Sequence, residues 1–409
     1  MRMVHFADLH LGVENYGRLD LRTGLSSRVV DFLKSLDKLV DYSIEQDVDM
    51  VLFAGDAFKN RTPPPTYQRE FARRIHKLAV EAGIPTFLLV GNHDVPASQK
   101  RASTLDIFST LSIPRVTVGR KPGIYHLKTK SGMVQILALP WITRAMFLGD
   151  EKFHATSLEE AENEILRRVH IGVADFMEKL DGDLPTVFAF HGSVQGATFG
   201  SERSIMIGND ILLPPSLFRS NKIDYVALGH IHKHQVVMDD PPAVYAGSME
   251  RIDFGEAREA KGFVVVDLER GRAKWEFIDV HARPFVDIRV DVRGEREPTL
   301  PVVREINRHD INGAVVRLKI LMEETQEASL NEKAIMEALE RAFSVASVVK
   351  NVERVSRLRL GSRSVEGMTP AELLEVYFKS KGFPADRISK LMERANLVFR
   401  KQRGIDSAL

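Results

Sequence analysis

Residues 86–94 read TFLLVGNHD, a short apolar run that stops at a glycine and continues into three polar side chains. The same pattern occurs in residues 3–10 (MVHFADLH) and 50–56 (MVLFAGD). Between these runs, residues 26–47 and 65–82 place apolar side chains at helical spacing, which predicts helices. Strands that alternate with helices predict a layered α/β fold. The polar turns then follow the carboxyl ends of the strands, which is the edge where such sheets bind ligands.

Changes of pattern further along the chain predict the domain boundaries. Short strands separated by turn residues close a first domain, and a strand–helix–strand–helix–strand order then predicts a small α+β domain. A basic linker follows, and the last segment opens with TPAE, a capping box with proline at the first helical position, before two predicted helices. The predicted segments are 1–283, 284–355, 356–368 and 369–409.

The composition excludes several classes of protein. The chain has 409 residues, enough for two or three domains, and its net charge of +1 does not indicate a partner. It has no cysteine, which excludes disulfides, thiolate metal sites and a cysteine nucleophile. No stretch reaches the ~18 apolar residues of a membrane helix, and the first residues do not resemble a signal peptide. We therefore expect a cytoplasmic protein that does not bind a membrane.

Polar clusters that follow the apolar runs offer seven candidate metal ligands. They are Asp8, His10, Asp56, Asn92, His191, His230 and His232. In the D-x-H and H-x-H pairs the two side chains lie at i and i+2, on one side of an extended backbone, so each pair can hold one ion. Seven ligands are too many for one tetrahedral ion, whereas Asp56 as a bridge would give four to each of two ions. Imidazole combined with oxygen ligands favours Mn, Fe or Zn over calcium, and two such ions are suited to phosphodiester cleavage.

Two residues beside the ligand Asn92 are predicted to be catalytic. His93 is placed to reach the substrate, where it would protonate the leaving alkoxide or stabilise the charged transition state. Asp94 is predicted to orient that imidazole. His234 extends the last cluster to H-x-H-x-H, but the ligand count is already met, so we expect it outside the ligand set.

The motifs DLHLG, GDAF, GNHD, FHGS and GHIH resemble the five signatures of the calcineurin-like metallophosphoesterases. More narrowly, HFADLHLG, the segment YAGSMERIDFGE (Tyr245–Glu256) and the additional C-terminal domains resemble the SbcD family of nuclease subunits. The resemblance implies a four-layer sandwich of two mixed sheets flanked by helices over 1–283, and a DNA-binding capping domain over 284–355. It also implies 3′ to 5′ exonuclease activity on double-stranded DNA and endonuclease activity on single-stranded DNA, in double-strand-break repair.

The same resemblance assigns roles to individual residues. It implies that Asp8, His10, Asp56 and His232 bind one ion, that Asp56, Asn92, His191 and His230 bind the other, and that both ions are manganese. His93 corresponds to the catalytic histidine of the family. Some relatives carry a further histidine where this chain has Lys59. A homodimer formed by the helices after the second and third motifs is also implied.

A nuclease requires cations that neutralise the phosphates of its substrate. The candidate DNA contacts are Lys59, Arg61, Lys100, Arg101, Lys233 and Arg251. Residues 354–409 contain 12 Lys and Arg but 6 Asp and Glu, so this end of the chain is suited to DNA or to a partner subunit.

The two C-terminal helices carry apolar stripes that a short helical pair cannot bury on itself, which predicts docking onto another chain. The candidate partner contacts are Leu373, Tyr377, Phe378, Leu391 and Phe399. The chain contains no G-x-x-x-x-G-K-[ST] motif, so ATP hydrolysis must come from another subunit. The resemblance implies an SMC-like ATPase of the SbcC type.

Two other functions are compatible with the same ligands. One is a metallophosphoesterase that acts on small phosphodiesters or phosphoproteins, and the other is a non-catalytic scaffold that binds DNA ends. The first shares every metal ligand with the nuclease, so the features that distinguish the two lie outside the ligands, in the capping domain and the terminal helices. The complete ligand set argues against the second, because a scaffold has no need of it.

Overall fold

The computed structural model describes residues 1–95, 101–143, 158–200, 210–353 and 368–402. The chain divides into two compact units. The first comprises 1–290, 299–320 and 331–349, and the second comprises 291–298, 321–330 and 350–409. No helix among the described residues is both long and apolar enough to cross a lipid bilayer.

The first unit contains a six-stranded sheet with the strand order β16-β15-β1-β4-β5-β6. Its strands are β1 Arg2–Phe6, β4 Met50–Phe53, β5 Thr86–Leu89, β6 Val116–Gly119, β15 Gly262–Glu269 and β16 Arg272–Asp279. Strands β1, β4, β5 and β6 are parallel, and β15 and β16 continue the sheet in antiparallel pairing. The three quoted apolar runs are therefore neighbouring parallel strands, so their polar turns share one edge.

A second six-stranded sheet has the order β13-β14-β12-β9-β8-β7. Its strands are β7 Gly123–Thr129, β8 Gly132–Leu139, β9 Thr186–His191, β12 Tyr225–Gly229, β13 Gln235–Asp239 and β14 Pro242–Tyr245. Strands β8, β9, β12 and β14 are parallel, whereas β7 and β13 pair in antiparallel fashion. The sheet is thus mixed, like the first one.

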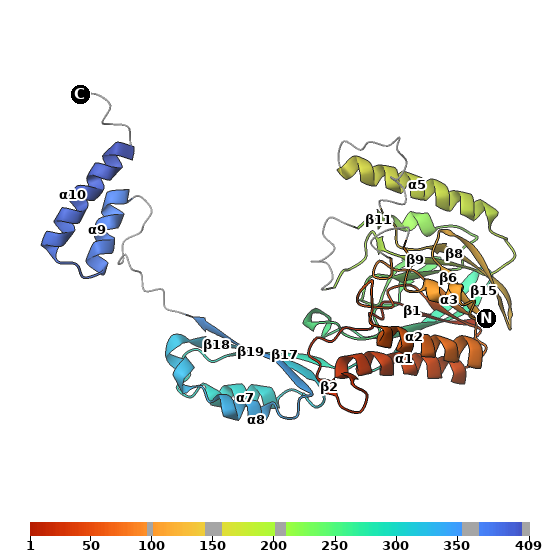
Figure 1. The fold of residues 1–409 in the computed structure, drawn as a ribbon, viewed down its shortest axis with the longest axis horizontal. Coiled ribbons are helices and arrows are strands. Elements are labelled where there is room, and N and C mark those ends of the chain that lie inside the picture. The colour runs from red at the N-terminus through yellow and green to blue at the C-terminus, as the bar shows by residue number, and fades with distance from the viewer. Residues whose placement is uncertain (96–100, 144–157, 201–209, 354–367, 403–409) are drawn as a thin grey trace. The chain divides into compact units, whose positions relative to one another are not determined.

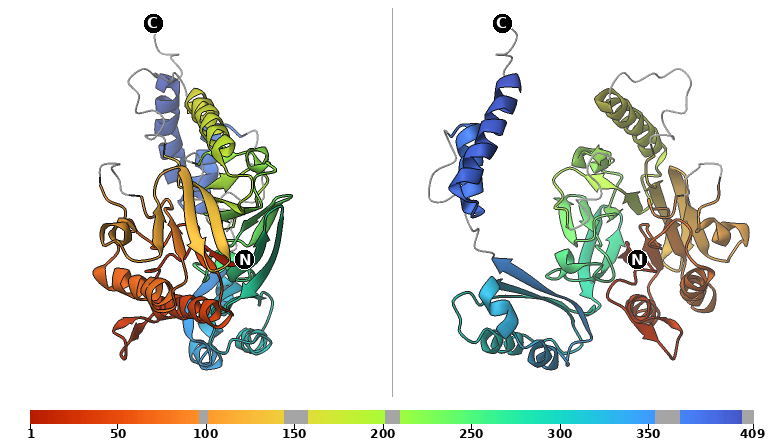
Figure 2. Two further views of the ribbon diagram at one scale, coloured as in Figure 1. Left: turned by 90° about the vertical axis from the view of Figure 1, so that its right-hand side faces the viewer. Right: turned by 60° about the vertical axis from the view of Figure 1, so that its left-hand side comes forward.

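Side-chain alternation along the strands builds four layers. In β1, Met3 contributes to a buried cluster between the two sheets, whereas Val4 and Phe6 contribute to a cluster under helix α1 Ser27–Glu45. Ile165 and its neighbours on helix α5 Leu158–Lys179 cover the outer face of the second sheet. Figures 1 and 2 show α1 and α5 on opposite sides of the paired sheets. The predicted four-layer sandwich is confirmed.

The remaining short elements of the sandwich lie in its connections. They are β2 Leu19–Asp20, β3 Leu25–Ser26, α2 Pro65–His76, η1 Lys77–Glu81, α3 Asp106–Thr110, β10 Ser193–Val194, β11 Leu212–Leu213, η2 Pro215–Phe218 and η3 Phe254–Glu256. Helix α2 with η1 spans the predicted helix at 65–82, and proline occupies its first turn.

A separate three-stranded sheet has the order β17-β18-β19. Its elements are β17 Phe285–Asp291, α7 Thr299–Asn307, β18 Val315–Glu323, η4 Glu324–Ser329, α8 Glu332–Ala338 and β19 Ser344–Glu353. This is the strand–helix–strand–helix–strand order that the sequence predicts. The division of the chain at residue 283 stays a prediction.

The C-terminal helices are α9 Pro370–Ser380 and α10 Ala385–Gln402. The predicted capping box is present, because the Glu372 carboxylate accepts from the backbone N–H of Thr369 at 2.7 Å and the Thr369 hydroxyl accepts from the N–H of Glu372 at 3.3 Å. Ile388 is buried between the helices, whereas Leu397 and Val398 are 58% and 56% exposed.

Candidate metal centre

The seven candidate ligands lie at the carboxyl ends of strands from both sheets. Asp8 and His10 follow β1, Asp56 follows β4, Asn92 follows β5, His191 ends β9, and His230 and His232 follow β12. They form groups whose ligand atoms lie within 4.8 Å of one another, one made of Asp8, His10 and His232 and another of Asp56, His191 and His230. The amide oxygen of Asn92 lies 2.9 Å from Nε2 of His191 and 3.0 Å from Nδ1 of His230. The fold therefore brings all seven together.

Left-handed backbone conformations aim several of these side chains inward. Asp8, His10, Asp56 and His230 have φ angles of 51°, 46°, 64° and 104°. Each such conformation costs a non-glycine residue about 1–3 kcal/mol and persists only where surrounding structure enforces it. Four of the seven candidate ligands therefore occupy strained positions, which is a property of functional sites.

Glycines at the strand ends leave room for the ligands. A Cβ atom on Gly91 would lie 2.2 Å from Oδ1 of Asp56, and one on Gly55 would lie 2.3 Å from Nδ1 of His191. Gly55 also has a φ of 100°, which favours glycine. These two glycines are required for the close approach of the candidate bridging carboxylate and a candidate imidazole ligand.

Each of three histidines has a hydrogen-bond acceptor on the ring nitrogen that faces away from the cluster. Nδ1 of His191 lies 2.6 Å from the carbonyl oxygen of Ala54, and Nε2 of His230 lies 2.8 Å from Oδ2 of Asp210. Nδ1 of His232 lies 2.8 Å from Oε1 of Glu256. An acceptor on one nitrogen holds the proton there and leaves the other nitrogen with a lone pair. The lone pairs of all three rings thus point into the cluster.

Charge in the cluster also favours cations. Burial raises the pKa of Asp8, and burial followed by the charge of Asp56 raises the pKa of Asp94 to about 7. Burial opposes ionisation of Asp56 too, but the neighbouring His191 and other imidazoles hold its pKa below the ordinary value. Buried carboxylates at this density need positive charge beside them. The donor set therefore fits divalent metal ions, as the sequence predicts.

His93 lies at the edge of the cluster. Its ring centroid is 4.8 Å from that of His10, and its Nδ1 lies 2.6 Å from the backbone carbonyl oxygen of Lys59. The prediction that Asp94 orients this imidazole is wrong. Asp94 is fully buried and accepts hydrogen bonds from the backbone N–H groups of Asp56, Ala57 and Gly91. Its carboxylate thus ties the Asp56 turn to the Gly91 turn.

The candidate DNA contacts differ in their surroundings. Nε of Arg61 lies 3.4 Å from the carbonyl oxygen of Asn92, and the exposed side chain lies beside the ligands. Lys59 is half-buried and contributes its carbonyl to His93. Lys233 is also half-buried, whereas Arg101 is exposed. Lys100 lies outside the described residues.

The predicted DNA contact by Arg251 is contradicted. Its guanidinium is half-buried and donates to three backbone carbonyl oxygens, those of Ala282, Arg283 and Glu259, at 2.7–3.0 Å. A guanidinium that holds three carbonyls has few donors left for a phosphate. Arg251 thus joins the backbone at Ala282 and Arg283 to the backbone at Glu259.

Sequence reasoning missed the residues behind the ligands. Asp210 and Glu256 contact His230 and His232, and the indole ring of Trp141 lies 4.9 Å from the His230 ring. Glu256 ends the segment YAGSMERIDFGE, so this motif could have indicated its role. Asp210 and Trp141 lie in stretches of sequence without a recognisable motif. His234 lies outside the ligand set, as predicted, and stacks on Phe277.

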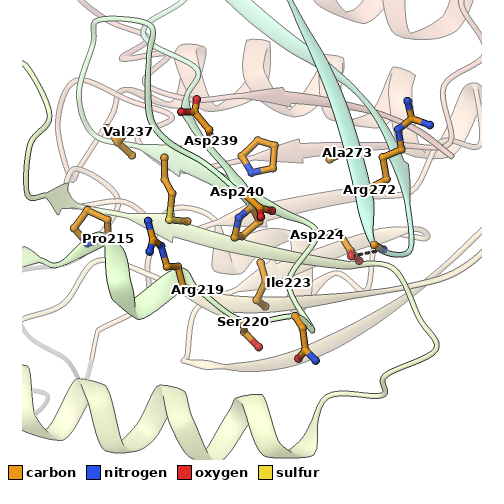
Figure 3. A pocket seen from close by; sticks show the side chains of 15 residues that line it. Pro215, Arg219, Ser220, Ile223, Asp224, Val237, Asp239, Asp240, Arg272 and Ala273 are labelled. Atoms are coloured by element: carbon orange, nitrogen blue, oxygen red, sulfur yellow. Dashed lines mark hydrogen bonds between the residues drawn. The ribbon is translucent and has the colours of Figure 1, made fainter.

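A separate cavity of about 1280 Å³ opens at the opposite end of β12, next to Ile223 and Asp224 (Figure 3). Its buried carboxylate is already engaged, because Asp224 pairs with Arg270 at 2.7 Å and accepts from the backbone N–H groups of Thr186 and Gly271. In the part of the chain that the structure describes, no group of three or more potential ligands lies beside this cavity.

Two mixed sheets that hold a cluster of candidate metal ligands at their carboxyl edges define a metallophosphoesterase. The family model of the calcineurin-like phosphoesterases matches residues 1–234, and the chain belongs to this family. It is 26% identical over 322 residues to the D subunit of nuclease SbcCD from Staphylococcus saprophyticus, a match that covers 78% of each chain. It is 28% identical over 286 residues to the D subunit of nuclease SbcCD from Rhodobacter capsulatus, covering 67% of this chain and 68% of that protein. These comparisons confirm the resemblance to the calcineurin-like metallophosphoesterases and the narrower resemblance to SbcD subunits that the motifs indicate.

A solved structure, TT1561 of Thermus thermophilus, aligns with 68% of this chain and 99% of its own, at 14% identity and a TM-score of 0.38.

Proposed function

We propose that this protein is a metal-dependent DNA nuclease, the SbcD-type subunit of an ATP-dependent complex that processes DNA ends and hairpins in double-strand-break repair. The observation that carries the proposal is the convergence of seven donors, with the imidazole protons of three histidines held on the outward nitrogens. The relatives named as subunits of nuclease SbcCD support the choice of DNA as substrate. A cytoplasmic location belongs to the same proposal, because chromosomal DNA is the substrate.

The ligand sets of the proposal are those implied by the motifs. Asp8, His10, Asp56 and His232 would hold one ion, and Asp56, Asn92, His191 and His230 the other, with manganese as the proposed metal. Two divalent ions bound there supply charge stabilisation for an in-line displacement at phosphorus. Asp56 lies close to a histidine of each proposed ligand set, which supports its bridging role. Its Oδ2 lies 3.7 Å from Nε2 of His10 and 3.4 Å from Nε2 of His191.

His93 is the proposed general acid. Its Nδ1–H donates to the carbonyl oxygen of Lys59, which fixes the ring beside His10 and leaves Nε2 to exchange a proton with the leaving oxygen. Arg61, exposed beside Asn92, is the described cation best placed to hold a phosphate next to this ring. Lys59, Arg101 and Lys233 remain further candidates for contacts with the DNA backbone.

The helical pair α9–α10 is the proposed docking element for an SMC-like ATPase subunit. Tyr377 is 40% exposed, and Leu397 and Val398 are more than half exposed, so the pair leaves apolar surface on the outside. Leu373, Phe378, Leu391 and Phe399 are only partly buried, as expected if a second chain completes their burial. The relatives are named as subunits of a two-component nuclease, which supports this partner.

A homodimer belongs to the same proposal. An apolar groove of about 550 Å³ lies between α2 and α3, the helices that follow the second and third motifs. Ile107 and Leu111 on its rim are 48% and 63% exposed. A second copy of the chain would bury these side chains.

The proposal is tested by incubating Mn²⁺-loaded protein with end-labelled duplex DNA and, in parallel, with a chromogenic phosphodiester. Stepwise shortening of the 3′ strand is the expected result. Activity on the small ester alone would favour the small-molecule phosphoesterase, and absence of cleavage on both substrates would favour the scaffold.

A further inference from the structure

The two ring nitrogens of His232 have different surroundings. Its Nε2 lies 3.0 Å from Nε2 of His10 and thus faces the cluster of Asp8 and His10. Its Nδ1 lies 2.8 Å from Oε1 of Glu256, whose side chain is fully buried. A buried carboxylate accepts the Nδ1 proton, so the ring presents a lone pair at Nε2.

Glu256 is itself held by two further groups. Its Oε2 accepts from the backbone N–H of Ile252 at 2.9 Å and pairs with Nζ of Lys261 at 2.9 Å. Lys261 is 1% exposed and donates in addition to the carbonyl oxygen of His232 at 3.1 Å and to Oγ of Ser248 at 2.9 Å. Lys261 therefore contacts both the carboxylate that binds the His232 ring and the backbone that carries it.

This arrangement differs from that of the other histidines. His191 is held by a backbone carbonyl oxygen, and His230 by Asp210, which is partly exposed at 12% of its side chain and accepts from Ser193. Burying both charges of an ion pair has a large desolvation cost, and apolar residues of similar volume would often serve stability as well. The pair behind His232 therefore calls for a role besides packing.

We propose that Glu256 and Lys261 are positioning residues that fix the orientation and the Nδ1 proton of His232, and so set the affinity of one of the two metal positions. The affected position is the one formed by Asp8, His10, Asp56 and His232. This inference rests on the proposed two-metal function. It predicts that loss of the Glu256 carboxylate weakens the binding of one of the two ions and leaves the binding of the other unchanged.

The test is Mn²⁺ binding to metal-free full-length protein, measured by isothermal titration calorimetry, for wild type, Glu256→Gln and Glu259→Gln. Glutamine at 256 keeps the volume and one acceptor oxygen but removes the charge. Glu259 is the matched control, because its Oε2 also lies 2.9 Å from Nζ of Lys261. The carboxylate that accepts from the ring of His232 is that of Glu256. We expect Glu256→Gln to bind one Mn²⁺ as wild type does and the second about 10–100-fold more weakly. Glu259→Gln should bind both as wild type does.

Thermal unfolding of the metal-free variants separates this role from a general loss of stability. If Glu256→Gln does not fold, the double variant Glu256→Gln, Lys261→Met removes the lysine charge as well and is measured in its place, with the same expected loss of one ion. Wild-type affinity for both ions in the folded variant, or an equal loss in Glu259→Gln, would overturn the positioning role and leave the proposed function intact. If wild-type protein itself fails to bind two ions, the proposed function fails, and the inference fails with it.

Discussion

Nδ1 of His93 donates to the backbone carbonyl oxygen of Lys59 across 2.6 Å. The bond joins the loop after β5 to the loop after β4, and it fixes the imidazole at the rim of the ligand cluster. The backbone of Lys59, rather than its side chain, orients the catalytic candidate. This contact is the basis of the first prediction.

His93→Ala should lower the rate of DNA cleavage by about 10²–10⁴-fold, because a general acid contributes about that much. Metal and DNA binding should be retained, since the seven candidate ligands remain. Single-turnover cleavage of duplex DNA, together with Mn²⁺ titration, measures both. A variant that cleaves at the wild-type rate would exclude the assigned role.

Gly91→Ala should reduce Mn²⁺ affinity and cleavage together, because its Cβ would lie 2.2 Å from Oδ1 of Asp56 and displace the candidate bridge. Gly172→Ala is the matched control, since a Cβ at this position of α5 has no heavy atom within 4 Å. Alanine there should stabilise the helix by about 1 kcal/mol and leave metal binding unchanged. Equal metal affinity in the two variants would contradict the geometry of the bridge.

Leu397→Lys should weaken association with the proposed ATPase subunit by at least about 10-fold, because burying an unpaired lysine charge in an apolar contact costs more than the roughly 1.4 kcal/mol that this factor represents. Leu300→Lys, on α7, is the control, as the two leucines are 58% and 57% exposed. Pull-down and titration with purified partner measure the effect, and nuclease activity of the isolated protein should not change. Equal binding by both variants would argue against docking through α10.

Leu111→Lys should convert a dimer into a monomer, because the charge enters the apolar groove between α2 and α3. Ile171→Lys on α5 changes a residue of similar exposure, 57% against 63%, and should leave the dimer intact. Sedimentation analysis distinguishes the two species. A wild-type protein that is monomeric at micromolar concentration would refute the proposed dimer.

Asp31→Ala should destabilise the fold by about 3–5 kcal/mol, because it leaves a buried charge without one of its partners. Oδ2 of Asp31 lies 2.7 Å from Nη1 of Arg28, a side chain that is 1% exposed. The Asp31 carboxylate also accepts from Nε and Nη2 of Arg283, both at 2.6 Å. Asp267→Ala removes the partner of the exposed Arg2 and should cost less than about 1 kcal/mol. Urea unfolding measures both, and similar losses would show that the buried network is not critical.

The sequence by itself determined the fold class and the seven ligand candidates. Apolar runs of strand length, each ending in a glycine or in a D-x-H or H-x-H pair, carry this information locally, because parallel strands place their carboxyl ends at a common edge. The same local logic predicted the capping box at Thr369, where all the interacting groups lie within four residues.

Only the tertiary structure decided which residues hydrogen-bond to the candidate ligands and which charged side chains are engaged within the protein. The sequence suggested that Arg251 contacts DNA and that Asp94 orients His93. In the fold, Arg251 instead donates to the carbonyl oxygen of Ala282, and Asp94 accepts from the backbone N–H of Asp56. Glu256 lies 24 residues from His232 in sequence and Asp210 lies 20 residues from His230, and no spacing rule links them. Ligand types follow from local pattern, whereas hydrogen-bond partners and burial depend on which distant segments the two packed sheets bring together.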